Sequence, residues 1–267
     1  MKHKDRVNVQ VLREMKLAGE KIAMLTAYDF FTARMLDQSG VDILLVGDTV
    51  GMAFGGQGTT IGVRLEHIVY HAEIVVRATK RAMVIGDMPF LTYQLTIDMA
   101  VENAGRLMQD SKVQAVKLEG GRAMVPVIKR ILRAGIPVMG HLGLTPQSVH
   151  RFGGFRVQGR DAESAMRLRE AAKALEDAGC FAIVLEAIPS ELAGEVTASL
   201  AIPTIGIGAG PRCDGQVLVT PDMLGLTNFE AKYLKKFADV RSVMQVGIEA
   251  YVREVKAKQF PTEEQGY

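Results

Sequence analysis

Long hydrophobic runs and a surplus of charge of one sign are both absent from this chain of 267 residues. The longest apolar segments are short, such as residues 43–46, and a membrane-spanning helix needs roughly 20 apolar residues. Lys and Arg together number 32, and Asp and Glu number 30. The overall charge therefore does not indicate a nucleic acid or an anionic membrane as a partner, and we expect neither.

Cysteine is also scarce. Cys180 and Cys213 are the only two, and they do not form a CxxC motif. Residues 1–16, MKHKDRVNVQVLREMK, lack the apolar core of a signal peptide. Two reduced thiols and no leader are typical of a cytosolic protein, so a cytoplasmic location is expected.

Short apolar segments alternate with amphipathic ones along the whole chain, without a linker-like change in composition. Eight segments are predicted strands: 22–25, 43–46, 83–85, 115–118, 137–140, 181–185, 204–207 and 216–219. Helical spacing of apolar residues predicts helices over 30–38, 65–81, 99–109, 124–133 and 163–177. Several of these helices stop at a glycine, which is a common helix terminator.

Eight strands alternating with helices predict one α/β domain, a (β/α)8 TIM barrel over residues 1–267. A doubly wound open sheet is the alternative, because sequence does not show closure. The connection from the seventh to the eighth strand looks too short for a helix. An extra N-terminal helix over 9–17 is expected to plug one barrel end. A C-terminal helical tail covers 238–258, and residues 262–267 are expected to fray.

Ionisable side chains occur at the ends of five consecutive predicted strands. Asp48 follows the strand 43–46, and strand alternation places it on the same face as Leu44 and Val46. The next strands end in VIGDMP, VKLEGG, VMGHLG and IVLEAIP, which contribute Asp87, Lys117 with Glu119, His141, and Glu186. In a barrel the carboxyl ends of all strands share one mouth, where such enzymes carry out their chemistry. The series predicts an active site there.

Asp48, Asp87 and Glu119 offer only oxygen ligands, which suit a hard cation such as Mg²⁺. The alternative is that two of them pair with Lys117 or with arginines in a salt-bridge network. Lys117 lies on the same strand face as Glu119. It either neutralises a substrate carboxylate or forms a Schiff base, and the sequence leaves both open.

Glu186 follows a very apolar strand, and burial raises the pKa of a carboxyl group toward that of a working general base. The alternative is a carboxylate bonded to loop amides. His141 is expected to orient substrate or assist proton transfer, or else to be a satisfied core histidine.

Two other patterns are interpreted as structural, and a third is left open. IGIGAG, residues 205–210, resembles a dinucleotide fingerprint, but Pro211 follows it, so a tight loop at the barrel mouth is expected. His67 and His71 have helical spacing without the glutamate of a zinc-protease motif and are expected to pack. The glycine-rich loop 55–60 either closes over substrate or is an ordinary surface loop.

The chain resembles the ketopantoate hydroxymethyltransferase family in segments that follow one another along nearly its whole length. The segments are MLTAYD (24–29), LLVGDTVGM (44–52), YHAEIVVRA (70–78), GDMPFLTYQ (86–94), AVKLEGG (115–121), PVMGHLGLTPQ (137–147), VLEAIP (184–189) and IGIGAGPRCDGQVLVTPDMLGL (205–226). The resemblance implies a (β/α)8 barrel, a magnesium ion and a large homo-oligomer, commonly a decamer. It also implies that 5,10-methylenetetrahydrofolate hydroxymethylates 3-methyl-2-oxobutanoate at the start of pantothenate synthesis.

Matching the motifs implies roles for individual residues. Metal ligands would be Asp48 and Asp87, with Glu119 completing the magnesium site. The keto acid would be held by Asp48, Thr49, Asp87 and Lys117. Glu186 would accept the proton. The family more often has serine at the position of Thr49, so the hydroxyl is kept and a methyl group is added.

The chemistry of the residues agrees with this reaction. A 2-oxo acid chelates Mg²⁺, which stabilises the enolate formed when a base removes the C3 proton. Folate is implied by the resemblance alone. The enzyme alternative is a magnesium-dependent carbon–carbon lyase or mutase of the phosphoenolpyruvate/pyruvate barrel type. A non-catalytic oxo-acid binding protein is a further alternative, which the costly cluster of charges disfavours.

Overall fold

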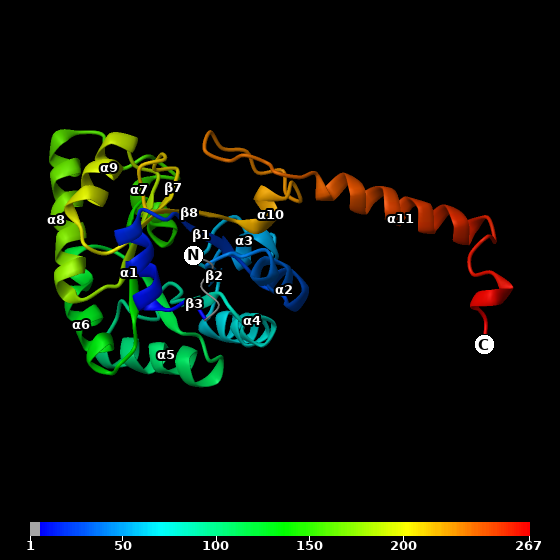
Figure 1. Ribbon diagram of the computed structural model, residues 1–267, viewed down its shortest axis with the longest axis horizontal. Helices are drawn as coiled ribbons and strands as arrows, with labels where there is room; N and C mark the ends of the chain where they lie inside the picture. Colours follow the sequence, from blue (N-terminus) through cyan, green and yellow to red (C-terminus); the bar gives the residue numbers. More distant parts are fainter. Residues whose placement is uncertain (1–5) are drawn as a thin grey trace. The chain divides into compact units, whose positions relative to one another are not determined.

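The computed structural model describes residues 6–267. Eight parallel strands close into a barrel in which each strand pairs with its neighbours in chain order (Figure 1). The strands are β1 Ile22–Thr26, β2 Ile43–Val46, β3 Met83–Asp87, β4 Ala115–Glu119, β5 Val138–Gly143, β6 Ala182–Glu186, β7 Thr204–Ile207 and β8 Gly215–Leu218. Because β1 also pairs with β8, from Ile22 opposite Gly215 to Leu25 opposite Leu218, the open-sheet alternative is wrong and the barrel is confirmed.

Helices surround the barrel on its outer side (Figure 1). They are α2 Phe30–Gln38, α4 Leu65–Ala78, α5 Ile97–Asp110, α6 Val125–Arg133, α8 Ala162–Ala178 and α9 Ser190–Ser199. Helix α1 Val9–Ala18 precedes β1, and two short helices, α3 Val50–Ala53 and α7 Val149–Phe152, belong to the connections after β2 and β5. Local signals set several ends. Asp29 and Asp161 accept backbone N–H bonds at the starts of α2 and α8. Gly19 and Gly179 end α1 and α8 in the left-handed conformation.

Two expectations about helices differ from the structure. The helix predicted over 65–81 ends at Ala78, because the Asp37 carboxylate accepts the backbone N–H groups of Lys80, Arg81 and Ala82 at 2.7–2.9 Å. Helix α9 was not expected. It contains Gly194 and β-branched residues, whose helix propensity is low, and packing of its buried side chains holds it in place. No helix occurs in residues 208–214, as expected for the short connection between β7 and β8.

The barrel interior is apolar at its amino-terminal end, and helix α1 closes it. Val11, Leu12 and Met15 of α1 belong to the same buried cluster as the inward side chains of the strands, such as Ile22 and Met83. The Lys16 amine, 2.8 Å from the Asp214 carboxylate, ties the end of α1 to the start of β8. The expectation that the extra helix plugs one barrel end is confirmed, and the polar mouth lies at the opposite end.

The described residues divide into two compact units, and the barrel belongs to the first, which ends at Val219. The second unit, Thr220–Tyr267, contains α10 Thr220–Met223, α11 Val240–Lys256 and the 3₁₀ turn η3 Glu263–Gln265. Helix α11 falls within the predicted tail 238–258. A single domain over 1–267 and fraying of 262–267 stay predictions. Within residues 6–267, no helix is both long and apolar enough to cross a membrane.

Candidate active site

The seven side chains singled out from the sequence line one small cavity at the carboxyl ends of the strands. Its volume is about 50 Å³. The contributing residues are Asp48 and Thr49 after β2, Asp87 of β3, Lys117 and Glu119 of β4, His141 of β5 and Glu186 of β6. The register of the parallel strands brings these residues next to one another, with Asp87 opposite Lys117 and Glu119 opposite His141. The expectation that these residues meet at one mouth of the barrel is confirmed. Their roles in binding and catalysis stay predictions.

Lys117 is the central cation of this cavity. Its amine lies 2.9 Å from Asp87 Oδ1 and 3.4 Å from His141 Nδ1, and its side chain is almost fully buried. Burial lowers the pKa of Lys117, but the surrounding carboxylates, Asp87 first, outweigh burial and raise the pKa above its usual value. Lys117 is therefore an ammonium ion, which neutralises negative charge and is a poor nucleophile.

His141 lies between two glutamates. Its Nε2 is 3.1 Å from Glu186 Oε2, and its Nδ1 is 3.4 Å from Glu119 Oε1. Burial and the Lys117 charge lower the pKa of His141, whereas its close contacts with the two glutamates raise it more strongly, giving a pKa of about 9. The imidazolium is therefore the favoured form at neutral pH, and it holds Glu186 at the edge of the cavity. Of the two glutamates, Glu186 has the more exposed side chain, at 16%.

Negative charge is in excess in the cavity. Burial raises the pKa of Asp48 well above its usual value, and the carboxylates of Asp87 and Glu119 raise it further. Burial also raises the pKa of Asp87, against the opposing effect of Lys117. Four carboxyl groups thus face two cationic side chains. Such a cluster favours an additional cation, because like charges in a poorly solvated site repel.

The donor atoms fit a hard divalent cation. Asp87 Oδ1 and Glu119 Oε1 are buried and make no well-aligned hydrogen bond to the described residues, although they lie within ion-pair distance of Lys117 and His141. Carboxylate oxygens with unused lone pairs are the ligands that Mg²⁺ prefers. Among residues 6–267, no three His, Cys, Asp or Glu side chains already form a complete metal-binding group. The Lys117 ammonium supplies positive charge beside Asp87. Binding of a metal ion by Asp48, Asp87 and Glu119 stays a prediction.

Neutral polar residues near the mouth were not singled out from the sequence. Gln147 is the middle residue of the 3₁₀ turn η2 Pro146–Ser148, which lies between β5 and α7. It hydrogen-bonds to Asp48 at 2.9 Å and to Glu119 at 3.1 Å. The Tyr28 hydroxyl bonds to the Thr49 hydroxyl. Both residues follow a strand end by a few positions. The charged residues were found by searching the carboxyl ends of the predicted strands for ionisable side chains. The same search, extended to uncharged side chains that form hydrogen bonds, would have found Tyr28 and Gln147.

The patterns interpreted as structural have structural partners. His67 Nδ1 accepts the N–H of Arg64 at the start of α4, and His71 Nδ1 lies 2.6 Å from the Tyr28 carbonyl oxygen. Gly210 has a φ of 79° in a tight loop, where a Cβ would lie 2.1 Å from Ser190 Oγ. The tight loop within 205–210 is confirmed, and glycine is required there by both conformation and space. A lid role for the loop 55–60 stays a prediction.

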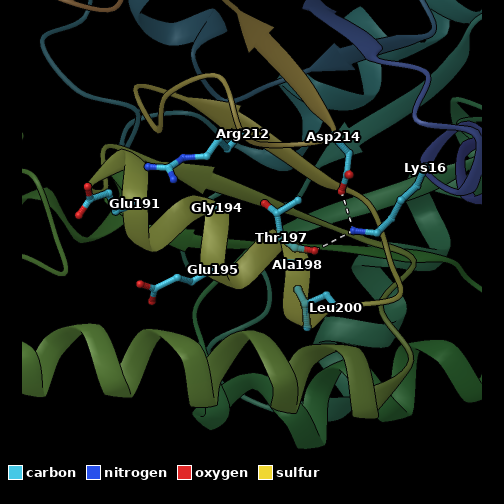
Figure 2. A pocket seen from close by; sticks show the side chains of 9 residues that line it. All are labelled: Lys16, Glu191, Gly194, Glu195, Thr197, Ala198, Leu200, Arg212 and Asp214. Atoms are coloured by element: carbon cyan, nitrogen blue, oxygen red, sulfur yellow. Dashed lines mark hydrogen bonds and ion pairs between the residues drawn. The ribbon is translucent and has the colours of Figure 1, made fainter.

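A larger hollow of about 730 Å³ lies beside α9 and away from the strand-end charges (Figure 2). In Figure 2 the Lys16 amine points to Asp214 and to the Thr197 carbonyl oxygen, at 2.8 and 3.0 Å. Glu195 is bound by Arg169 of α8. Most of the charged side chains here are therefore paired on the protein surface. This hollow is larger than the cavity at the barrel mouth. The barrel mouth is nevertheless the better candidate for the active site, because its buried charges are not fully compensated.

The barrel and its buried acidic mouth define a class: (β/α)8 enzymes that act at the carboxyl ends of the strands. Solved structures agree on the fold. A phosphonopyruvate hydrolase in complex with oxalate and Mg²⁺ is similar with a TM-score of 0.63 and 10% identity, covering 95% of this chain and 88% of its own. A 2,3-dimethylmalate lyase of the phosphoenolpyruvate mutase/isocitrate lyase superfamily has a TM-score of 0.60 at 18% identity, covering 97% and 91%.

Sequence comparison is more specific. The family model of ketopantoate hydroxymethyltransferase matches residues 6–263. The 3-methyl-2-oxobutanoate hydroxymethyltransferase of Chlorobaculum parvum is 52% identical over 98% of this chain and 96% of its own. That of Syntrophomonas wolfei is 53% identical over 97% and 94%. The chain belongs to the ketopantoate hydroxymethyltransferase family, and the resemblance seen in its motifs is confirmed.

Proposed function

We propose that this chain transfers a hydroxymethyl group from 5,10-methylenetetrahydrofolate to 3-methyl-2-oxobutanoate. The product is ketopantoate (2-dehydropantoate), which feeds pantothenate and coenzyme A synthesis. The observation that carries the proposal is the buried cluster of Asp48, Asp87 and Glu119 beside Lys117 at the strand ends, in a chain whose relatives at 52–53% identity are named for this reaction.

Asp48, Asp87 and Glu119 would hold Mg²⁺, since they combine buried carboxylate oxygens with excess negative charge. When bound, the ion would stabilise negative charge that develops on the keto oxygen. The keto acid would bind beside the ion in the same cavity, whose lining also includes Thr49, Lys117 and Glu186. We propose that the loop 55–60 closes over the bound substrate.

Lys117 and Thr49 would hold the keto acid. The Lys117 ammonium attracts the substrate carboxylate, and the Thr49 hydroxyl, fixed by Tyr28, offers a hydrogen bond. A Schiff base would require an unprotonated amine, which the surrounding carboxylates disfavour. Borohydride added with the keto acid should leave the mass of the protein unchanged. A reduced adduct on Lys117 would contradict the electrostatic role.

Glu186 would remove the C3 proton of the keto acid. Its carboxylate borders the cavity, and His141 holds it in place at 3.1 Å. The electron pair of the broken C–H bond remains on the substrate as an enolate, and the proton goes to Glu186. Water cleaves the two C–N bonds of the methylene bridge, which releases tetrahydrofolate and the carbon at the formaldehyde level, and C3 of the enolate adds to that carbon. The carbonyl oxygen of the added carbon takes up a proton and becomes the hydroxyl. Neither oxidant nor reductant is needed, because the transferred carbon is reduced to a primary alcohol while C3 is oxidised in the same step.

Product analysis tests the proposal. Incubation with 3-methyl-2-oxobutanoate, methylenetetrahydrofolate and Mg²⁺ should yield ketopantoate and tetrahydrofolate. Omitting the folate should leave C3 proton exchange and abolish the product. The rival is a lyase or mutase of the kind named among the fold neighbours, and carbon–carbon cleavage without folate would favour it. Binding of the keto acid without exchange or turnover would favour a non-catalytic binding protein.

We also propose a large homo-oligomer, a decamer by family resemblance, with small molecules as the other partners. Light scattering during gel filtration should give ten times the chain mass, and the chain mass itself would contradict this. A cytoplasmic location, and the absence of nucleic-acid and membrane partners, stay predictions.

A further inference from the structure

Gln147 makes an unusually complete set of hydrogen bonds at the barrel mouth. It lies in η2 Pro146–Ser148, between β5 and α7, and is 5% exposed. Its side-chain Nε2 donates to Asp48 Oδ2 at 2.9 Å and to the Met88 carbonyl at 3.0 Å. Its Oε1 accepts from the Tyr93 hydroxyl at 2.7 Å and from Gln94 Nε2 at 3.1 Å. Both donors and both acceptor positions of the amide are used.

These partners fix the orientation of the amide. A rotation by 180° would place Oε1 against the Met88 carbonyl oxygen and the Asp48 carboxylate, which are both acceptors. The same rotation would turn Nε2 toward the Gln94 amide nitrogen, which is a donor. Gln147 therefore always presents a donor to Asp48.

The backbone of Gln147 binds a second carboxylate. Its N–H donates to Glu119 Oε2 at 3.1 Å, while the Tyr93 hydroxyl accepts the Glu119 backbone N–H at 3.1 Å. One residue thus joins an acid that follows β2 to an acid at the end of β4. The third acid is held in a similar way, because the Asp48 N–H donates to Asp87 Oδ2 at 3.2 Å.

Hydrogen bonds from Gln147 or from the backbone bind one oxygen of each carboxylate. The other oxygens of Asp87 and Glu119 lie 2.9 Å from the Lys117 amine and 3.4 Å from His141 Nδ1, respectively. The second oxygens of Asp87 and Glu119 are buried and have no well-aligned hydrogen bond to residues 6–267. Asp48 and Glu119 repel each other when both are ionised, and their hydrogen bonds to Gln147 oppose their separation. Partners of this kind orient metal ligands, and losing one commonly costs 10–100-fold in metal affinity.

We propose that Gln147 is a positioning residue that holds one oxygen each of Asp48 and Glu119, so that their other oxygens are presented together to a divalent cation. The proposal rests on the proposed magnesium site and goes beyond it by assigning the residue that sets the spacing of two ligands. Gln147 touches neither the ion nor the reacting atoms in this role.

The test compares Gln147→Met with a matched control, Gln216→Met. Both exchange a glutamine for an apolar side chain of similar length, but Gln147 bonds to the carboxylates, whereas the exposed Gln216 bonds to the Gly210 carbonyl oxygen. Binding is followed by titration with Mn²⁺ alone, using calorimetry and the electron paramagnetic resonance spectrum of the bound ion. Gln147→Met should weaken binding about 10–100-fold and alter the spectrum, whereas Gln216→Met should stay within about threefold of wild type. Loss of binding in Asp48→Asn locates the titrated ion at the mouth.

A second variant covers failure of Gln147→Met to fold. Tyr93→Phe keeps the ring and removes the hydroxyl that holds the Gln147 amide, so it should weaken Mn²⁺ binding by at least about threefold, a fraction of the full loss. Wild-type affinity and spectrum in the folded Gln147→Met protein, or in Tyr93→Phe if the first does not fold, would overturn the proposal.

The outcome is separable from that of the proposed function. Weakened Mn²⁺ binding in a protein that makes no ketopantoate would support the role of Gln147 and contradict the proposed reaction. If the wild type makes ketopantoate and Gln147→Met binds Mn²⁺ with wild-type affinity, the proposed reaction is supported and the role of Gln147 is contradicted. A wild-type protein that binds no Mn²⁺ at Asp48 would contradict the role of Gln147.

Discussion

At the scale of single residues, the mouth of the barrel is governed by buried charge. Asp48 follows β2 and Asp87 ends the neighbouring strand β3, yet the surroundings of the two acids differ. Asp87 is paired with the Lys117 ammonium at 2.9 Å. Asp48 receives a neutral donor from Gln147, and the carboxylates around it raise its pKa well above the usual value. The two acids should therefore respond in opposite ways to neutralisation.

Asp48→Asn should stabilise the metal-free protein and abolish metal binding. The substitution keeps the shape and removes one of several buried like charges, a gain of about 1 kcal/mol, the free energy that corresponds to roughly one unit of pKa. For a chain of this size the melting temperature should rise by about 2–4 °C. Calorimetric melting without metal, followed by Mg²⁺ titration, measures both effects.

Asp87→Asn is the matched control. It leaves the Lys117 ammonium without its closest partner, and breaking a buried ion pair costs about 3–5 kcal/mol. Its melting temperature should fall. Equal melting temperatures for the two variants would contradict the different roles assigned to the two acids.

Glu186→Gln tests the proposed base. The amide keeps the shape of the side chain but does not accept the proton, so metal and keto-acid affinity should persist. Exchange of the C3 proton with deuterated solvent should fall by at least about a hundredfold. Exchange isolates proton abstraction from the later attack on the folate-derived carbon. A wild-type exchange rate would remove Glu186 from the role and leave His141, 3.1 Å away, as the candidate.

At the scale of elements, the ends of adjacent strands position the catalytic side chains. Gly143 at the end of β5 pairs with Glu186 at the end of β6. Its φ is 93°, and a Cβ at this position would lie 2.1 Å from the Glu186 carbonyl oxygen. Glycine is required there by conformation and by close approach, so the backbone of β5 sets where Glu186 lies.

Gly143→Ala should displace the end of β6 and slow C3 exchange by at least about tenfold, since misplacing a catalytic group by 1 Å costs up to about a hundredfold. Gly135→Ala is the control: its φ of 84° imposes a similar backbone strain, but a Cβ there meets no atom within 4 Å. That variant should lose about 1–2 kcal/mol of stability and keep the exchange rate. Equal exchange rates in both variants would contradict the positioning role of Gly143.

At the scale of the whole molecule, closure of the barrel buries its core from both sides. One apolar cluster fills the space between strands and helices, and a second fills the barrel interior above α1. Both cysteines are unbonded and lie within the first cluster, with Cys180 2% exposed and Cys213 0%. Burial raises the pKa of the Cys180 thiol to about 12.

The thiols should therefore report global unfolding. At pH 8 only about one Cys180 thiol in ten thousand is ionised, and the thiolate is the reactive form. Iodoacetamide should modify neither cysteine in the native protein and both in denaturant, as read by mass spectrometry. Modification of Cys180 or Cys213 at denaturant concentrations below the unfolding transition would show that the core opens locally.

Local patterns in the sequence were enough to place the strands and the charged residues of the mouth. The strands at 43–46 and 204–207 were predicted with their observed bounds, and α2 was predicted over its full length. Apolar runs and side-chain periodicity depend on neighbouring residues alone, and parallel strands in a closed barrel bring their last residues together. The rule that active sites form at this end then located Asp48, Asp87, Lys117, Glu119, His141 and Glu186.

Only the tertiary structure decided features that depend on residues far apart in the chain. Asp37 ends α4 by binding the backbone of Ala82, 45 positions away. Packing holds α9 despite its weak helical pattern. Gln147 joins Asp48, 99 positions away, to Glu119. A side-chain amide has no periodicity and no charge to mark it, so its role becomes visible only when the partners of each hydrogen bond are in place.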